Sequence, residues 1–333
     1  MSTKEAVLLE LMRSDSVSGE RLAEMLGVSR SAVWKAIAQL REDGHQIEAA
    51  TNRGYRLADP REILSEAAIR NALETRAFGR EIELHREIDS TNCRAKELAA
   101  HGAPHGMLVC ARSQTGGRGR FQRSFHSPED GGVYMSLILR PTLPAERAVM
   151  LTSMTAVAVA RAIEHIADVQ VKIKWVNDLY INARKVCGIL CEAGMDFESG
   201  QLEYAVVGVG VNTARQEFPP ELQGIATSVG NECGREISPN RLTAEICACM
   251  EAEYEHLADG RFMAESRERS NVIGRKILVL RGDERFSARA LDIDDQGGLV
   301  IETDAGVQTV RSGEISIRWE EEQLTYKECA ESR

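Results

Sequence analysis

A chain of 333 residues is long enough for two or three domains, and its shares of hydrophobic (43%) and charged residues (28%) are those of a soluble globular protein. The net charge of −10 argues against a protein that coats nucleic acid over its whole surface. Residues 1–60 carry eight Lys/Arg and nine Asp/Glu, a net charge of −1, which permits local contact with DNA. We expect no signal peptide and no membrane span, because polar residues interrupt the longest apolar stretch, 148–166.

Eight cysteines are scattered along the chain without a CxxC pair. The closest sets are Cys187 with Cys191 and Cys247 with Cys249, and neither has the spacing of a zinc site. Reduced thiols in a cytoplasmic protein fit this pattern best. The sequence therefore predicts no metal site built from protein ligands.

Residues 1–60 show three short helical patterns followed by a pair of strands. The apolar positions that mark the helices are Val7, Leu8, Leu11 and Met12, then Leu22, Ala23 and Leu26, then Val33, Ile37 and Leu40. Gly27 suits a tight turn before the third helix, and Ser29 suits its N-cap. Residues 46–50 and 54–57 read as strands joined by 51–53. This order predicts a winged helix-turn-helix.

Residues 61–77 read as a helical connector, and 78–272 as a larger α+β region. Its strand candidates are 106–111, 133–139, 171–176, 186–192 and 204–211, and its helix candidates are 91–101, 148–167 and 240–257. They do not alternate as a regular βαβ repeat, which favours a mixed sheet. Residues 273–320 contain five short strand patterns between turns, as in a small β-barrel, and 321–333 read as a frayed tail.

The stretch 114–128, QTGGRGRFQRSFHSP, combines three glycines with Arg118, Arg120 and Arg123. Glycine lets a backbone approach a ligand closely, and arginine binds carboxylates and phosphates with paired hydrogen bonds. The composition fits an anion-binding loop and a flexible basic surface loop about equally. It is not a P-loop, because no Gly-Lys-Ser/Thr follows.

Three further motifs are weak when each is taken alone. The segment KWVND at 174–178, followed by RKVCGIL at 184–190, offers lysines that could neutralise a developing negative charge, although a solvated lysine at a turn is commoner. The pair of glycines in GVGVN at 208–212 also fits simple close packing in a strand. The segment DSTN at 89–92 is typical of a helix cap.

Taken together, these motifs resemble the biotin–protein ligases. Ser90–Thr91–Asn92, GRGR at 117–120, KWVND, RKVCGIL and GVGVN follow in that family's order and spacing. With the winged helix in front and the barrel behind, the resemblance spans nearly the whole chain and extends to the bifunctional members that also repress the biotin operon. It implies an α+β fold with an N-terminal winged helix-turn-helix, a central mixed-sheet catalytic domain resembling the class II synthetases, and a C-terminal SH3-like barrel.

The resemblance also implies roles for individual residues. Those expected to bind biotin are Ser90, Thr91, Asn92, Gln114, Gly117, Arg118, Gly119, Arg120 and Lys185. Those expected to bind the nucleotide are Arg118, Arg120, Arg123, Phe125, Asn177, Asp178 and Asn212. Arg118, Arg120 and Lys185 would be catalytic. Three positions depart from the family pattern: Phe125 stands in place of tryptophan, Val176 in place of proline, and Gln122 in place of glycine.

The implied reaction uses ATP and Mg²⁺ to convert biotin into biotinyl-5'-AMP, because a carboxylate is a poor acyl donor. A lysine of the biotin carboxyl carrier protein, a subunit of acetyl-CoA carboxylase, would then attack the mixed anhydride. Biotinyl-5'-AMP would also act as corepressor for a homodimer on operator DNA, with Arg30, Ser31 and Lys35 in the major groove and Arg53 at the wing. The alternatives are a biotin-sensing repressor without catalysis and a lipoate or other acyl–protein ligase.

Overall fold

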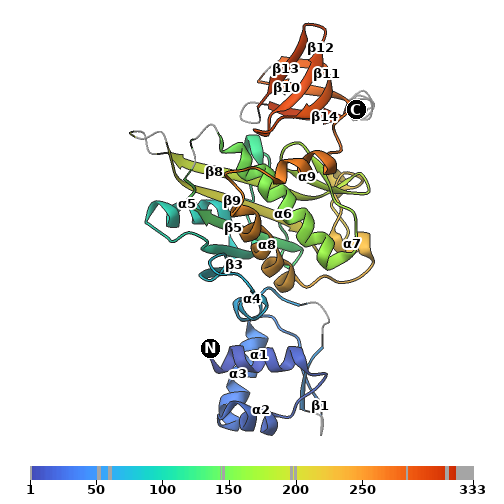
Figure 1. Cartoon of the computed structure of the whole chain (residues 1–333). Helices are drawn as coiled ribbons and strands as arrows, with labels where there is room; N and C mark the ends of the chain where they lie inside the picture. Colours follow the sequence, from blue (N-terminus) through green and yellow to red (C-terminus); the bar gives the residue numbers. More distant parts are fainter. Residues whose placement is uncertain are drawn as a thin grey trace.

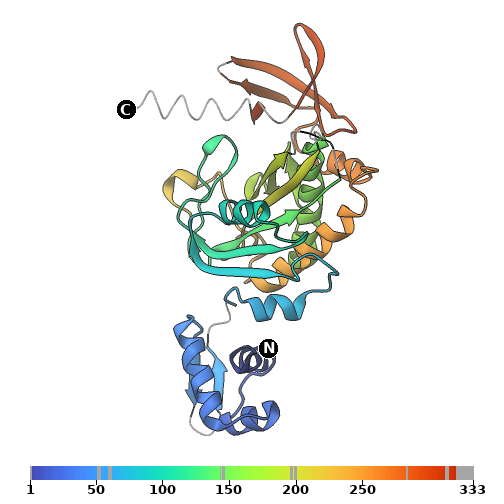
Figure 2. The ribbon, with the colours of Figure 1, turned by 90° about the vertical axis from the view of Figure 1, so that its left-hand side faces the viewer.

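The computed structural model describes residues 2–50, 54–58, 62–142, 144, 147–195, 198, 201–282, 284–311 and 315–319. Three regions follow one another along the chain: a helical N-terminal region, a large central sheet covered by helices, and a small C-terminal sheet (Figure 1). The view turned by 90° separates the same three regions (Figure 2).

The N-terminal region is a winged helix-turn-helix, as predicted. It contains α1 (Thr3–Arg13), α2 (Gly19–Leu26), α3 (Arg30–Glu42) and the antiparallel pair β1 (Ile47–Ala50) and β2 (Gly54–Leu57). The hydroxyls of Ser18 and Ser29 accept backbone N–H groups at the starts of α2 and α3, and Gly27 ends α2 with a φ of 64°. The apolar positions of the three helices pack into one buried cluster. Arg53, proposed for the wing, lies outside the described residues.

The central sheet is mixed, as predicted, with strand order β3-β4-β5-β9-β8-β7-β6. Its strands are β3 (Ile82–Ile88), β4 (Leu108–Gln114), β5 (Gly132–Leu139), β6 (Lys172–Lys174), β7 (Asp178–Ile181), β8 (Arg184–Met195) and β9 (Leu202–Asn212). β3 and β4 are parallel, and the other neighbours are antiparallel. The prediction omitted β3 and β7 and made β6 too long, because its chain leaves the sheet at Trp175.

Helices cover both faces of this sheet. α5 (Thr91–Ala100) packs on β4, β5 and β9, whereas α6 (Val149–Ala167) and α8 (Pro239–Tyr254) lie on the opposite face (Figures 1 and 2). α7 (Val229–Cys233) and α9 (Phe262–Arg269) were not predicted. Among the described residues of the connector, 62–77, only α4 (Glu66–Ala72) is helical, so the prediction of a helix over 61–77 was too long.

Among the described residues, α6 is the helix long and apolar enough to cross a membrane, with 19 residues and a mean hydropathy of 1.3. The polar residues that interrupt this stretch thus do not keep it from passing the test of length and composition. However, 72% of its apolar window is buried inside the protein. Burial against the sheet and α8 accounts for its composition, as in the core helix of a large domain.

The C-terminal region consists of β10 (Lys276–Arg281), β11 (Glu284–Ile293), β12 (Leu299–Thr303), β13 (Gly306–Val310) and β14 (Ile315–Trp319). They form an antiparallel sheet in the order β13-β12-β11-β10-β14, which confirms the five predicted strands. Closure into an SH3-like barrel and the domain boundaries stay predictions. Trp175 Nε1 donates to the Gly297 carbonyl at 3.0 Å, so the central sheet holds this region through the KWVND segment.

The winged helix-turn-helix is attached to the central sheet by a buried arginine. Arg112 on β4 donates from Nη1 to the backbone carbonyl of Asp43 at 2.6 Å, at the C-terminal end of α3. Its Nε and Nη2 bind the Asp130 carboxylate at 2.8 and 2.6 Å. Arg13 on α1 reaches Asn71 of α4 at 3.2 Å. The orientation of α3 is therefore tied to a central strand of the neighbouring region.

Candidate active site

Polar side chains from three elements meet at the N-terminus of α5. Gln114, at the end of β4, accepts from the backbone N–H and the hydroxyl of Thr91 at 2.9 and 3.2 Å. Its amide nitrogen donates to Ser127 Oγ at 3.0 Å. Ser90 is buried at the N-cap, yet its hydroxyl does not cap the helix. The structure thus brings the predicted residues Ser90, Thr91 and Gln114 together, and it adds Ser127.

Asn92 lies deeper in the same network. Ser136 Oγ on β5 donates its proton to Asn92 Oδ1 at 2.6 Å and lies 2.8 Å from Thr91 Oγ1. Asn92 Nδ2 donates to the Leu190 carbonyl at 3.2 Å and to Glu192 Oε2 at 3.0 Å. A fully buried hydroxyl and amide that satisfy each other make the network rigid, because leaving either unpaired would be costly.

Glu192 on β8 supplies a negative charge at the edge of this network. Burial raises its pKa, but hydrogen bonds from Lys96 and Asn92 lower it, and the net pKa lies below the usual value. Lys96 Nζ is 2.6 Å from Glu192 Oε1. Glu192 and Ser136 were missed from the sequence, since nothing in the order of residues shows that they face Asn92 across the sheet.

The GVGVN motif leaves a strip of β9 without side chains. A Cβ on Gly208 would lie 2.0 Å from Asn92 Oδ1, and one on Gly210 would lie 2.5 Å from Phe125 Cε1. Gly210 pairs with Gly188 on β8, where a Cβ would lie 3.3 Å from the same ring. The Phe125 ring therefore rests on bare backbone of two strands, with its edge toward Tyr134 at a centroid distance of 6.4 Å.

The arginine–glycine loop doubles back on itself. Phe125 N–H donates to the Gly117 carbonyl at 2.9 Å, and Gly119 N–H donates to the Arg123 carbonyl at 2.7 Å. Phe121 and Gln122, near its tip, have φ values of 56° and 59°. This left-handed conformation favours glycine, which the resemblance implies for many family members at position 122, so Gln122 is held there under strain.

The three arginines of the loop differ in their exposure. Arg120 is half-buried, and its Nη1 lies 3.4 Å from Asn177 Oδ1. Burial lowers the Arg120 pKa, and the nearby Asp178 carboxylate opposes that shift. Arg118 and Arg123 are exposed. The structure thus joins Arg120 to the KWVND segment and leaves the other two arginines at the solvent face of the loop.

Lys185 and Asp178 form an ion pair beside Arg120, with 2.6 Å between Nζ and Oδ1. Asn177 is fixed by Nδ2, which donates to the Ile189 carbonyl at 2.9 Å. Asn212 is buried, and its Nδ2 donates to the Thr227 carbonyl at 3.0 Å. Two cations near one carboxylate, together with the polar cluster around Thr91, suit a ligand with a polar end and an anionic end.

The outer face of α3 carries the residues predicted to contact DNA. Arg30, Ser31 and Lys35 are exposed, but Arg30 is ion-paired with Glu20 of α2. Trp34, between them, is 65% exposed and was missed by the sequence analysis. The sequence could have predicted its exposure, because the helical spacing that buries Val33 and Ile37 places residue 34 on the outer face of α3.

Replacing Gly208 with alanine should disrupt the polar network. The new methyl group would overlap Asn92 Oδ1, so the hydrogen bond from Ser136 must break. We expect Gly208→Ala to lower the free energy of unfolding by about 1–3 kcal/mol and to weaken binding of the small-molecule ligand. Urea denaturation and ligand titration would measure both. Gly19→Ala, at the start of α2, is the control for an added methyl group, because its φ is not left-handed and its neighbour is a side chain, Tyr55. Equal ligand affinity in both variants would contradict the role of the bare strand.

Family models match three parts of the chain. Residues 84–212 match the biotin/lipoate A/B protein ligase family. Residues 3–56 match an HTH domain, and residues 272–318 match the biotin protein ligase C terminal domain. The three matches coincide with the central, N-terminal and C-terminal regions of the fold.

Individual relatives cover almost the full chain. It is 39% identical to the bifunctional ligase/repressor BirA of Bacillus subtilis, over 95% of this chain and 99% of the relative. The counterpart of Escherichia coli is 31% identical over 90% and 92%. The solved biotin protein ligase from Aquifex aeolicus, in complex with biotin and ATP, has a TM-score of 0.63 at 25% identity, over 72% of this chain and 99% of that one. The chain therefore belongs to the family of bifunctional ligase/repressor proteins.

Proposed function

We propose that this protein is a biotin–[acetyl-CoA-carboxylase] ligase that also acts as a transcriptional repressor. It uses ATP to convert biotin into biotinyl-5'-AMP and transfers biotin to a lysine of a biotin carboxyl carrier protein. The observation that carries this proposal is a hydrogen-bonded polar cluster, Thr91 with Gln114, in the same region of the chain's fold as the cations Arg120 and Lys185. Near-full-length relatives named as ligase and repressor support both activities.

In this proposal the pocket at the N-terminus of α5 holds the polar end of biotin. Ser90, Thr91 and Gln114 offer hydroxyl and amide groups, and Asn92 supports them from below. Gln114 and Thr91 are already ordered by hydrogen bonds with Ser127 and Ser136, so these two side chains lose little freedom on binding. The biotin carboxylate would then extend toward Lys185 and the loop at 117–120.

The activation step brings two anions together, the biotin carboxylate and the α-phosphate of ATP. Carboxylate oxygen attacks phosphorus, and pyrophosphate leaves. Arg118, Arg120 and Lys185 would offset the repulsion, with Lys185 exchanging Asp178 for the substrate oxygens. Mg²⁺ fits this site mainly through phosphates and water, because the Asp178 carboxylate is paired with Lys185; when bound, it neutralises phosphate charge.

The nucleotide would lie on the side of Phe125, Asn177, Asp178 and Asn212. Phe125 offers a smaller stacking surface for adenine than tryptophan does. Gly188 and Gly210 let its ring lie close to the backbone of the sheet. Asn212 would shape this side indirectly, by holding the segment at Thr227. Arg123, exposed at the loop, would reach the phosphates only when the loop closes.

The direct test is transfer of biotin. The purified protein is incubated with biotin, ATP and Mg²⁺, a biotin-acceptor domain is added, and the acceptor is weighed by mass spectrometry. We expect one added biotin on its lysine. Binding of biotin without transfer would favour a sensor without catalysis, and thermal protection by lipoate instead of biotin would favour the lipoate ligase alternative.

Arg118→Gly should separate activation from retention of the intermediate. Arg118 is exposed on the loop, so its loss should leave the fold intact while the lid over the mixed anhydride is weakened. We expect released biotinyl-5'-AMP and biotin on lysines of bystander proteins, measured by blotting with labelled streptavidin. Arg118→Lys, which keeps the charge, is the matched control. An adenylate held as tightly in Arg118→Gly as in the unaltered chain would count against a lid.

The second activity would lie on α3, which we place in the major groove of operator DNA. Ser31, Trp34 and Lys35 form its exposed face, and the Arg30 guanidinium must leave Glu20 to join them. Arg53 is proposed to contact DNA from the wing. A homodimer favoured by bound biotinyl-5'-AMP would make the adenylate a corepressor, because differential binding shifts a monomer–dimer equilibrium. DNA and carrier protein as partners fit a cytoplasmic location.

Trp34→Ala should reduce operator binding and spare ligation. An exposed indole on a recognition helix can contact thymine methyl groups, so we expect a loss of about 1–3 kcal/mol in specific binding. Electrophoretic mobility shift at fixed salt, with random DNA as competitor, measures it. Val307→Ala removes a similarly exposed side chain (62%) from β13 and serves as control. Unchanged operator affinity in Trp34→Ala would exclude this residue from the interface.

A further inference from the structure

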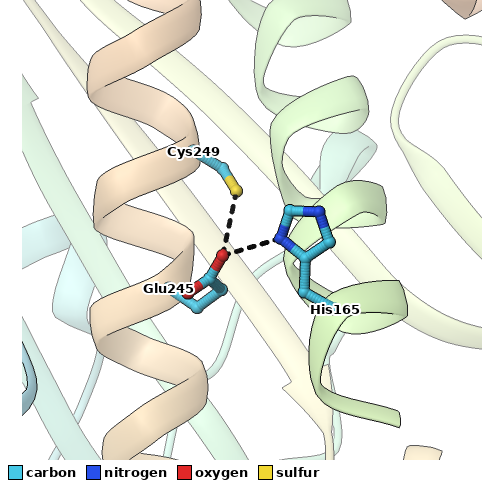
Figure 3. A group of neighbouring side chains, drawn as sticks. All are labelled: His165, Glu245 and Cys249. Atoms are coloured by element: carbon cyan, nitrogen blue, oxygen red, sulfur yellow. Dashed lines mark hydrogen bonds and ion pairs between the residues drawn. The ribbon is translucent and has the colours of Figure 1, made fainter. Parts of the chain in front are cut away.

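A cluster of three possible metal ligands lies far from the site described above. His165, Glu245 and Cys249 point toward one another from two neighbouring helices, α6 and α8 (Figure 3). His165 Nδ1 is 2.8 Å from Glu245 Oε1, and Cys249 Sγ is 3.6 Å from the same oxygen. One nitrogen, one oxygen and one sulfur atom all lie within 4.8 Å of one another.

The fold places this cluster on the opposite face of the central sheet from the active site. Glu245 and Cys249 are one turn apart on α8, so they share a face of that helix. His165 is close to the C-terminal end of α6, which packs against α8. The pocket around Thr91 lies on the face that α5 covers. The cluster therefore plays no part in the activity proposed above.

We propose that His165, Glu245 and Cys249 bind a divalent cation of borderline softness, with Zn²⁺ as the best fit. Imidazole nitrogen, carboxylate oxygen and thiolate sulfur are the three ligand types that zinc uses in proteins. Mg²⁺ requires oxygen ligands in a near-octahedral arrangement, so this donor set disfavours it. The cluster would therefore bind Zn²⁺, whereas the proposed ligation reaction uses Mg²⁺.

The charges of this group balance when the ion binds. The Cys249 S–H bond breaks, its proton goes to solvent, and a sulfur–metal bond forms. Neutral His165, the Glu245 carboxylate and the new thiolate then compensate a charge of +2. Arg161, one turn before His165 on α6, is already paired with Glu253 and Glu265, so its positive charge is compensated by these two carboxylates.

The cluster is also reachable from solvent. His165 lines a cavity of 340 Å³ together with Arg235, Glu236 and Arg241, and its own side chain is 61% exposed. The imidazole is therefore accessible to an ion from solvent, and a water molecule could take the fourth position of a tetrahedral site. Cysteine spacing alone did not predict this site, because its histidine stands 80 positions before Glu245 in the chain.

A bound ion would link α6 to α8 at the surface of the helical layer. Both helices pack against the central sheet, so the link should raise the thermal stability of the whole chain. It should leave biotin transfer unchanged at saturating Mg²⁺, since the active site lies across the sheet. The inference therefore stands or falls independently of the proposed ligase activity.

The full-length protein, stripped with a chelator, is dialysed against Zn²⁺ and analysed for metal content, and Co²⁺ is added to a second sample for visible spectroscopy. We expect the unaltered chain to bind one Zn²⁺ ion. His165→Ala and Cys249→Ser should lose this ion at low Zn²⁺, because each lowers the affinity for Zn²⁺ at least about tenfold. The Co²⁺ sample should show a sulfur-to-metal absorption that Cys249→Ser lacks. Circular dichroism checks that both variants are folded, and Cys249→Ala replaces the serine variant if it is not.

Two matched controls test the assignment. His256→Ala removes another histidine that is paired with a carboxylate, Asp259, and Cys233→Ser removes another partly exposed thiol. Both should bind Zn²⁺ like the unaltered chain. The proposal is overturned if the unaltered chain binds no Zn²⁺, if the variants at positions 165 and 249 bind it as tightly as the unaltered chain, or if a control loses it equally.

Discussion

The candidate active site depends on a strip of β-sheet that carries no side chains. Gly208, Gly210 and Gly188 let Asn92 and Phe125 lie against the backbone of β8 and β9, at distances where a methyl group would overlap them. The contact of Asn92 with Gly208 fixes the position of the polar cluster on the sheet. The contacts of Phe125 with Gly210 and Gly188 fix the distance of its ring from the sheet. The spacing of the two glycines on β9 thus sets the pocket and the ring side by side on one face of the sheet.

The charged side chains around this strip have partners before any ligand arrives, although two cations share one carboxylate. Lys185 is paired with Asp178, Lys96 with Glu192, and Arg120 lies near the same Asp178. Such pairing lowers the cost of holding cations in a partly buried place. An anionic ligand therefore has to replace the carboxylates that already bind these cations. Its affinity depends on the difference in free energy between the cations bound to the ligand and the same cations bound to their carboxylates.

The sequence predicted the winged helix, the longer strands and the main helices, because each has a clear apolar period. It did not predict β3, where charged residues dominate an edge strand (IELHREI), or β7, which has only four residues. In the site, the motifs identified Thr91, Gln114 and Arg120, whose residue types carry their own chemistry. Ser136 and Glu192 were missed because their roles come from facing Asn92 across strands, which register determines and local pattern does not.

Arg112 and Gln114 are two residues apart on β4, so their side chains lie on the same side of that strand. Gln114 binds Thr91 in the polar cluster proposed to hold the ligand, while Arg112 binds the carbonyl of Asp43, the C-cap of α3. The angle at which α3 would enter a DNA groove therefore depends on the position of β4 in the central sheet. In the proposed homodimer, the central sheet would therefore determine the distance between the two α3 helices, and with it the spacing of DNA half-sites that the dimer can bind. Insertions between the N-terminal and central regions would change that spacing.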